Sequence, residues 1–114
     1  MFRKGTMKQQ GIDITIKNNP NHVLAPDDWK KVMAVRLGRM GAGEYKEYYH
    51  GLLKKRWDTR RQEILDLAGQ GSREDIVLKC FCPESASYCH AHSAAAFMNG
   101  LVRKMQARGE ETHG

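Results

Sequence analysis

Residues 76–92 read IVLKCFCPESASYCHAH, and this stretch decides the fold. Residues 76–81 are almost continuously apolar, which is typical of a strand buried in a parallel sheet. A loop over residues 82–86 follows, and Ser87 is a favourable N-cap for a helix. The apolar stripe of that helix consists of Ala91, Ala94, Ala95, Met98, Leu101, Val102 and Met105. The stretch therefore predicts a strand, a tight loop and a helix.

An earlier strand is predicted at residues 12–16, where apolar and polar residues alternate in IDITI. Turn residues at 17–21 end it. A helix is then expected to open at Pro26, with Asp27 and Asp28 in its first turn, where acidic groups suit the helix dipole. The apolar stripe expected for this helix is Trp29, Val32, Met33, Leu37 and Met40.

A second helical stretch begins near Glu44 and ends at Gly69 and Gly71. Residues 59–62 (TRRQ) match a capping box, so either a new helix starts at Thr59 or one bent helix continues. The order becomes strand, two or three helices, strand, helix. This order predicts a small α/β domain with parallel strands, because a helical crossover favours parallel pairing. Two strands make a thin sheet, so either a further strand is present or dimerisation completes the core.

The chain has 114 residues, enough for one domain. We divide it into an N-terminal arm at 1–11, a single α/β domain at 12–107 and a flexible tail at 108–114. The first residues do not read as a signal peptide, and no apolar stretch approaches a membrane span of about 20 residues. We therefore expect a cytoplasmic protein with no membrane partner. A net charge of +6 favours anionic partners such as nucleic acid, nucleotides or phosphorylated metabolites.

All three cysteines lie within ten residues, which is typical of a local site and not of a disulfide framework. Cys80 and Cys82 are two apart on a strand and share one face. Cys89 and His90 fall in the first turn of the last helix, where the helix dipole stabilises a thiolate. His92 lies three residues beyond Cys89 on the same helix face.

Three interpretations of this cluster stay open. In the first, an anionic small molecule or nucleotide binds at the turn, with Cys89 as a reactive thiol and His90 as acid or base. The further ligand-binding candidates in this case are Lys17, Cys82 and His92. Whether such a protein is an enzyme is left open.

In the second interpretation the cluster binds zinc, which takes four soft ligands in a tetrahedron. The candidate ligands are Cys80, Cys82, Cys89, His90 and His92. In the third, the cysteines are small core residues and the histidines are hydrogen-bonded side chains. No cofactor is assigned, and zinc is the one that the residue types allow.

A basic cluster surrounds Trp57 and consists of Lys54, Lys55, Arg56, Arg60 and Arg61. Such a run with an aromatic residue can bind phosphates and stack a base, as in a nucleic-acid or protein-interaction module. We favour a solvated helix face with Trp57 anchored in the core.

Several segments together make the sequence recognisable: residues 13–17 (DITIK), 25–29 (APDDW), 37–40 (LGRM), Glu44-Tyr45 with Tyr48-Tyr49, 56–63 (RWDTRRQE), and 77–83 (VLKCFCP) with Cys89-His90. From about residue 12 to 101 the chain resembles the domain of unknown function family 488, also called YeaO-like, of bacteria, archaea and phages. The resemblance implies a compact α/β domain and no settled activity. Members typically carry Arg after the Cys-His pair, where this chain has Ala91; His92 fits relatives with a basic or aromatic residue there.

Overall fold

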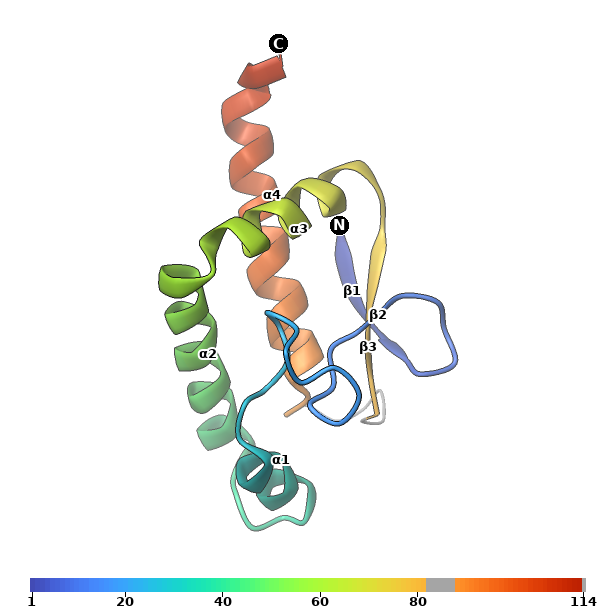
Figure 1. The fold of residues 1–114 in the computed structure, drawn as a ribbon, viewed down its shortest axis with the longest axis vertical. Helices are drawn as coiled ribbons and strands as arrows, with labels where there is room; N and C mark the ends of the chain where they lie inside the picture. Colours follow the sequence, from blue (N-terminus) through green and yellow to red (C-terminus); the bar gives the residue numbers. More distant parts are fainter. Residues whose placement is uncertain (82–87, 114) are drawn as a thin grey trace.

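Three parallel strands form a single sheet in the order β1-β3-β2 (Figure 1). The structure, a computed structural model, describes residues 1–81 and 88–113, with side chains as far as residue 107. The strands are β1 (Phe2–Thr6), β2 (Ile12–Asp13) and β3 (Ile76–Cys80). Ile12 pairs with Leu78, so the predicted parallel pairing of the two strands is confirmed. The predicted α/β fold is likewise confirmed.

Strand β1 is the further strand that the sequence analysis left open, and it lies within the residues treated there as an arm. It pairs with β3 from Phe2 against Ile76 to Thr6 against Cys80. At Phe2, the backbone N–H donates to Asn99 Oδ1 at 2.7 Å, and Asn99 Nδ2 donates to the Phe2 carbonyl at 2.8 Å. A side chain of the last helix thus satisfies backbone groups of this edge strand.

Strand β2 is shorter than the predicted strand at 12–16, and the side chain of Asp13 is the reason. Its Oδ1 accepts hydrogen bonds from the backbone N–H and the hydroxyl of Thr15, at 2.9 and 2.7 Å. Its Oδ2 accepts from Asn18 Nδ2 at 2.8 Å. The Ile14 N–H still donates to the Lys79 carbonyl at 3.3 Å, and beyond it these local bonds turn the chain away from β3. Residues 14–16 therefore belong to no strand.

The helices are α1 (Trp29–Arg36), α2 (Ala42–Thr59), α3 (Arg61–Arg73) and α4 (His90–His113). The first begins at Trp29 and not at Pro26, because the side chain of Asp28 caps it by accepting the Lys31 N–H at 3.2 Å. The expected apolar stripe of α1 is incomplete, since Trp29 is 47% exposed and Leu37 is also exposed.

Helices α2 and α3 are separate, with the break at Arg60. The capping box predicted at 59–62 is wrong: Thr59 is the last residue of α2, and its hydroxyl donates to the Lys55 carbonyl at 2.9 Å. Gln62 donates instead to the Asp66 carboxylate at 2.8 Å. Arg60 stabilises the corner by pairing with Glu63 and donating to the Asn21 carbonyl at 2.9 Å.

Helix α4 is the centre of the packing and contacts β1, β3, α2 and α3. In Figure 1 the helices α2 and α4 lie to the left of the sheet, and α3 runs from the end of α2 across α4 to the start of β1. The core between them contains Ile14, Tyr49, Ile64, Leu78 and Met98, each fully buried or nearly so. In residues 1–81 and 88–113, no helix combines the length and the apolar character needed to cross a membrane.

Candidate functional site

A pocket opens beyond the carboxyl ends of β2 and β3, where ligands bind in open parallel sheets. It encloses about 460 Å³ of empty space, including the open space at its mouth. Its lining is mostly apolar and comes from the loop after β2, from α1, from the start of α2 and from the start of α4. The residues that line it are Thr15, Ile16, Lys17, Pro26, Trp29, Val32, Val35, Arg36, Tyr45, Cys80, Phe81, Tyr88, Cys89 and His90.

Cys80, Cys89 and His90 form the buried part of this lining, and we call them the thiol–imidazole cluster. Cys80 is the last residue of β3, Cys89 immediately precedes α4, and His90 is its first residue. The two sulfur atoms lie 3.0 Å apart, and one ligand atom from each of the three residues lies within 4.8 Å of the others. Their exposed fractions are 3%, 1% and 6%.

One hydrogen bond shows which nitrogen of the His90 ring carries a hydrogen. Its Nε2 lies 2.8 Å from the carbonyl oxygen of Ile14. Because a carbonyl oxygen only accepts, Nε2 carries the hydrogen, and the neutral ring has its lone pair on Nδ1. The ring packs edge-on against Tyr49, with 5.3 Å between ring centroids. The imidazole is therefore held in one orientation from two sides.

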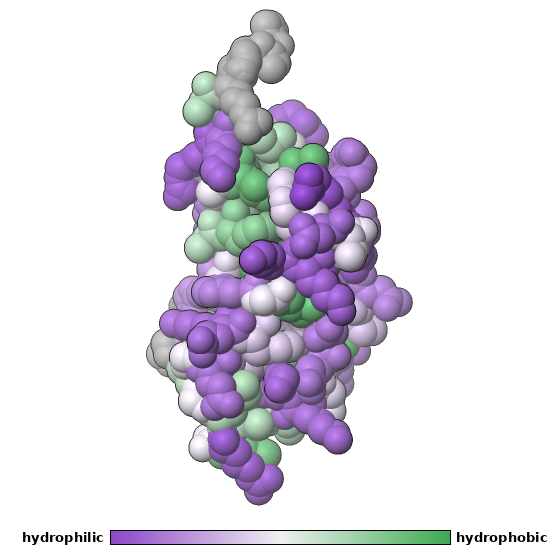
Figure 2. Space-filling model, turned by 90° about the vertical axis from the view of Figure 1, so that its left-hand side faces the viewer, coloured by the Kyte–Doolittle hydropathy of each residue, from purple (hydrophilic) through white to green (hydrophobic). Residues whose placement is uncertain are grey.

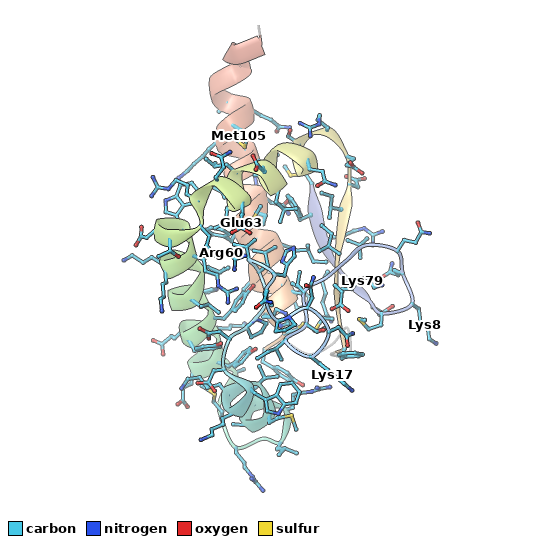
Figure 3. All side chains as sticks on the ribbon, viewed as in Figure 1. Lys8, Lys17, Arg60, Glu63, Lys79 and Met105 are labelled. Atoms are coloured by element: carbon cyan, nitrogen blue, oxygen red, sulfur yellow. The ribbon has the colours of Figure 1, made fainter. Side chains whose placement is uncertain are left out.

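Two cations, Lys17 and Arg36, lie exposed at the mouth of the pocket. Lys17 is on the loop after β2 (Figure 3), and its Nζ lies 5.8 Å from the centroid of the Phe81 ring. Phe81 and Trp29 are large aromatic side chains that remain partly exposed there. The mouth thus combines positive charge with flat apolar surfaces, which suits an anion that carries a planar group.

Arg56 supports one wall of the pocket from behind. It is buried, and its Nη1 donates to the carbonyls of His22 at 3.1 Å, Val23 at 2.8 Å and Ala25. Burial lowers the pKa of this guanidinium from its ordinary value. The three bonds hold the segment that leads to Pro26, a pocket residue, against α2.

Two tyrosines of α2 hold the same segment. The Tyr49 hydroxyl donates to the Leu24 carbonyl at 2.5 Å, and burial raises its pKa well above the ordinary value. The Tyr48 hydroxyl accepts from the backbone N–H groups of Asp27 and Asp28 and donates to the Asp27 carboxylate. Burial and this bond to Asp27 raise the pKa of Tyr48 to about 12. Both phenols therefore stay neutral donors at physiological pH.

The structure brings together Lys17, Cys89 and His90 from the first interpretation and Cys80 from the second. His92 is exposed and is not among the described lining residues. Cys82 lies outside the described residues. The sequence analysis missed Trp29, Arg36 and Phe81 at the mouth, and their aromatic or basic character was the only signal they offered.

The nucleic-acid interpretation of the basic cluster stays a prediction, although the structure buries one of its members. Arg56 is committed to three buried carbonyls and does not reach solvent as a phosphate ligand would. Arg60 is bound to Glu63, and the two side chains lie together at the α2–α3 corner (Figure 3). The Arg61 guanidinium lies 4.4 Å from the centroid of the Trp57 ring. Lys54 and Lys55 are exposed on α2.

Comparisons of this chain with family models, with curated proteins and with solved structures give no match, so the resemblance to the YeaO-like family stays a prediction.

Proposed function

We propose that the pocket binds an anionic small molecule with a planar group, such as a nucleotide, and presents Cys89 and His90 to it. The observation that carries this proposal is a single pocket with two cations at its mouth and a thiol and an imidazole in its depth.

The charges favour an anion. Lys17 and Arg36 come from different elements, and the positive end of the α4 dipole lies at Cys89 and His90. An anionic group bound between them meets positive potential from three directions. A planar group can then stack on Trp29 or Phe81, the two partly exposed aromatic side chains.

The reactivity proposed for the thiol–imidazole cluster follows from the tautomer of the His90 ring. In the neutral ring Nδ1 is the basic nitrogen, and in this proposal it accepts a proton from a thiol or from a bound ligand. Cys89 lies at the helix start, where the helix dipole favours a thiolate, although the burial of the sulfur opposes its ionisation. Thiol and imidazole are therefore the groups that would contact the reacting part of a ligand.

Fluorescence of Trp29 tests the proposal directly. The chain has two tryptophans, so Trp57→Phe leaves Trp29 as the only reporter. We expect a saturable change on titration with a nucleoside monophosphate and a much weaker one with the uncharged nucleoside. Inorganic phosphate separates the contribution of the charge from that of the base. No saturable change with any of the three at millimolar concentration would contradict the proposal.

A second candidate, a metal ion, is favoured by the donor set of the thiol–imidazole cluster. Two cysteines and one histidine within 4.8 Å suit zinc. The Nε2 bond to the Ile14 carbonyl is the kind of outer contact that orients metal-ligating histidines. Such an ion would act as a Lewis acid on a ligand in the pocket, and Cys82 is the sequence-based candidate for a fourth ligand.

Metal analysis of protein purified without an affinity tag tests this candidate. We expect about one zinc per chain, and a cobalt-substituted protein with a thiolate-to-cobalt absorption band. Cys89→Ser should remove both, whereas His92→Ala, a change at an exposed histidine of the same helix, should keep both. A metal-free preparation that does not take up cobalt would exclude a metal site here.

A further inference from the structure

Two cysteines from separate elements lie almost within bonding distance. The sulfur atoms of Cys80 and Cys89 are 3.0 Å apart, about 1 Å more than the disulfide bond length of about 2.05 Å. We propose that Cys80 and Cys89 form a reversible dithiol–disulfide couple that is oxidised by hydrogen peroxide. The couple is a modification site, and it goes beyond the binding of a ligand or a metal.

The position of the two residues favours this bond over other outcomes of oxidation. Cys80 ends the central strand of the sheet, and Cys89 immediately precedes the long helix α4. Both belong to the same buried core cluster, so packing already holds the sulfur atoms near each other. Bond formation therefore needs a small shift of two side chains, and little conformational entropy is lost.

Access for the oxidant comes through the pocket. Both cysteines are buried from bulk solvent, at 3% and 1% exposure, but both line the pocket. Hydrogen peroxide is small and uncharged, and it can reach the two sulfur atoms through the opening of this pocket. Thus the same burial that shields the sulfur atoms from large reagents still admits this oxidant.

The reaction balances with one molecule of hydrogen peroxide. The sulfur of Cys89 attacks one peroxide oxygen, the O–O bond breaks, and the thiol proton leaves with the other oxygen as water, giving a sulfenic acid. The sulfur of Cys80 then attacks the sulfur of Cys89, and the S–O bond breaks. The departing hydroxyl group combines with the Cys80 proton to form a second water, and the disulfide remains. Two thiols lose two electrons to the peroxide, and a dithiol reductant reverses the change.

The couple also has a consequence for the proposed functions. A disulfide sulfur is neither a nucleophile of the thiolate type nor a good metal ligand. Oxidation would therefore abolish the nucleophilic reactivity of Cys89 and release a metal ion bound by the two cysteines. The disulfide proposal itself requires neither a bound ligand nor a metal, so it can hold if both of those proposals fail.

Thiol mapping of the full chain tests the couple. Reduced protein, treated with a chelator, is exposed to hydrogen peroxide, blocked with an alkylating reagent, digested and analysed by mass spectrometry. We expect loss of two of the three thiols, a mass lower by two hydrogens, a peptide pair joined through Cys80 and Cys89, and recovery with a dithiol reductant. Cys82→Ser should keep this bridge, which makes it the matched control, whereas Cys89→Ser should lose it.

Other products would overturn the proposal. A bridge that includes Cys82, a disulfide between two chains, or a mass gain from oxygen on a single cysteine would each show that Cys80 and Cys89 are not the couple. Mapping of the unaltered chain is sufficient for the decision, so a variant that fails to fold does not affect it. Nucleotide titration of the same reduced sample reports separately on the ligand proposal.

Discussion

Two basic regions of this molecule use their charges in opposite ways. At the α2–α3 corner, arginines that are close in sequence are bound within the protein: Arg56 to carbonyls, Arg60 to Glu63 and Arg61 to the face of Trp57. At the pocket, Lys17 and Arg36 are far apart in sequence but lie exposed around one opening. Basic residues that are adjacent in sequence can thus be bound to groups of the protein itself, whereas basic residues far apart in sequence can converge on one opening.

The surface of α2 is the next feature of the basic region at the α2–α3 corner. The face that turns toward the viewer in Figure 2 is mostly hydrophilic, with its largest group of apolar side chains in the upper half and smaller ones near the middle and the lower end. Lys54 and Lys55 are exposed on α2, as expected for a solvated helix face. The following changes test the contrast between the corner and the pocket, in order of decreasing expected effect.

The largest effect is expected for Arg56→Ala. The change removes bonds to three carbonyls and leaves those of Val23 and Ala25 buried without this donor. Each buried group left unsatisfied costs about 1–3 kcal/mol, so we expect the free energy of unfolding to fall by roughly 3 kcal/mol or more. Urea denaturation measures this free energy. The control is Lys55→Ala, which should stay within about 0.5 kcal/mol of the wild type. Equal midpoints for the two variants would show that Arg56 is a surface residue in solution.

The next effect is expected at the loop that carries Lys17. Asp13→Ala removes the acceptor of three hydrogen bonds, and at about 1 kcal/mol each, with partial replacement by water, we expect a loss of about 2 kcal/mol at neutral pH.

The pH dependence of this effect has a defined sign. Burial opposes ionisation of Asp13, but hydrogen bonds from Asn18 and Thr15 outweigh it, so the pKa is lowered from its ordinary value near 3.8. The stabilisation is therefore complete above pH 3.8 and disappears as the pH falls through the folded-state pKa. Urea denaturation at a series of pH values should show wild type and Asp13→Ala converging in acid. A constant difference would contradict the assignment.

An effect of about tenfold is expected on the affinity of the pocket for a nucleoside monophosphate. Lys17→Glu and Arg36→Glu should each weaken binding by at least this factor, about 1.4 kcal/mol, because each reverses a charge at the mouth. Lys54→Glu makes the same charge change on α2 and should alter affinity little at 0.15 M salt, where screening over about 8 Å isolates distant charges. Equal losses of affinity for all three variants would indicate that the net charge of the protein attracts the nucleotide and that Lys17 and Arg36 have no specific role.

The smallest effect is expected for Arg61→Ala. The guanidinium above Trp57 is an exposed cation–π contact, typically worth about 0.5–1 kcal/mol. We expect a decrease of about 0.5 kcal/mol in the free energy of unfolding and a change in Trp57 emission, measured in a Trp29→Phe background. Lys54→Ala, an exposed change on α2, is the control for emission. A loss as large as that of Arg56→Ala would contradict the ranking of the corner arginines.

Prediction from sequence succeeded where the signal is local. The apolar run before Cys80 identified β3, and the alternation after residue 12 identified a parallel neighbour. The apolar stripe also identified the last helix, but Cys89 was expected in its first turn and immediately precedes α4, which begins at His90. Ser87, the predicted N-cap, lies outside the described residues. Strand β1 was not predicted, since FRKGT has no alternating pattern and only Phe2 and Gly5 are buried.

The sequence by itself therefore determined the α/β class and the parallel pairing of two strands. It also determined the edge of the sheet at which the cysteine and histidine side chains lie. Only the tertiary structure decided which residues meet there. It brought the sulfur atoms of Cys80 and Cys89 to 3.0 Å from each other and oriented His90 through the Ile14 carbonyl. It also brought Arg36 and Lys17 to the lining of one pocket. It also buried Arg56, which in sequence is indistinguishable from its exposed neighbours. The physical reason is that periodicity and caps act over a few residues, whereas burial and hydrogen bonding depend on groups from distant segments that only packing brings into contact.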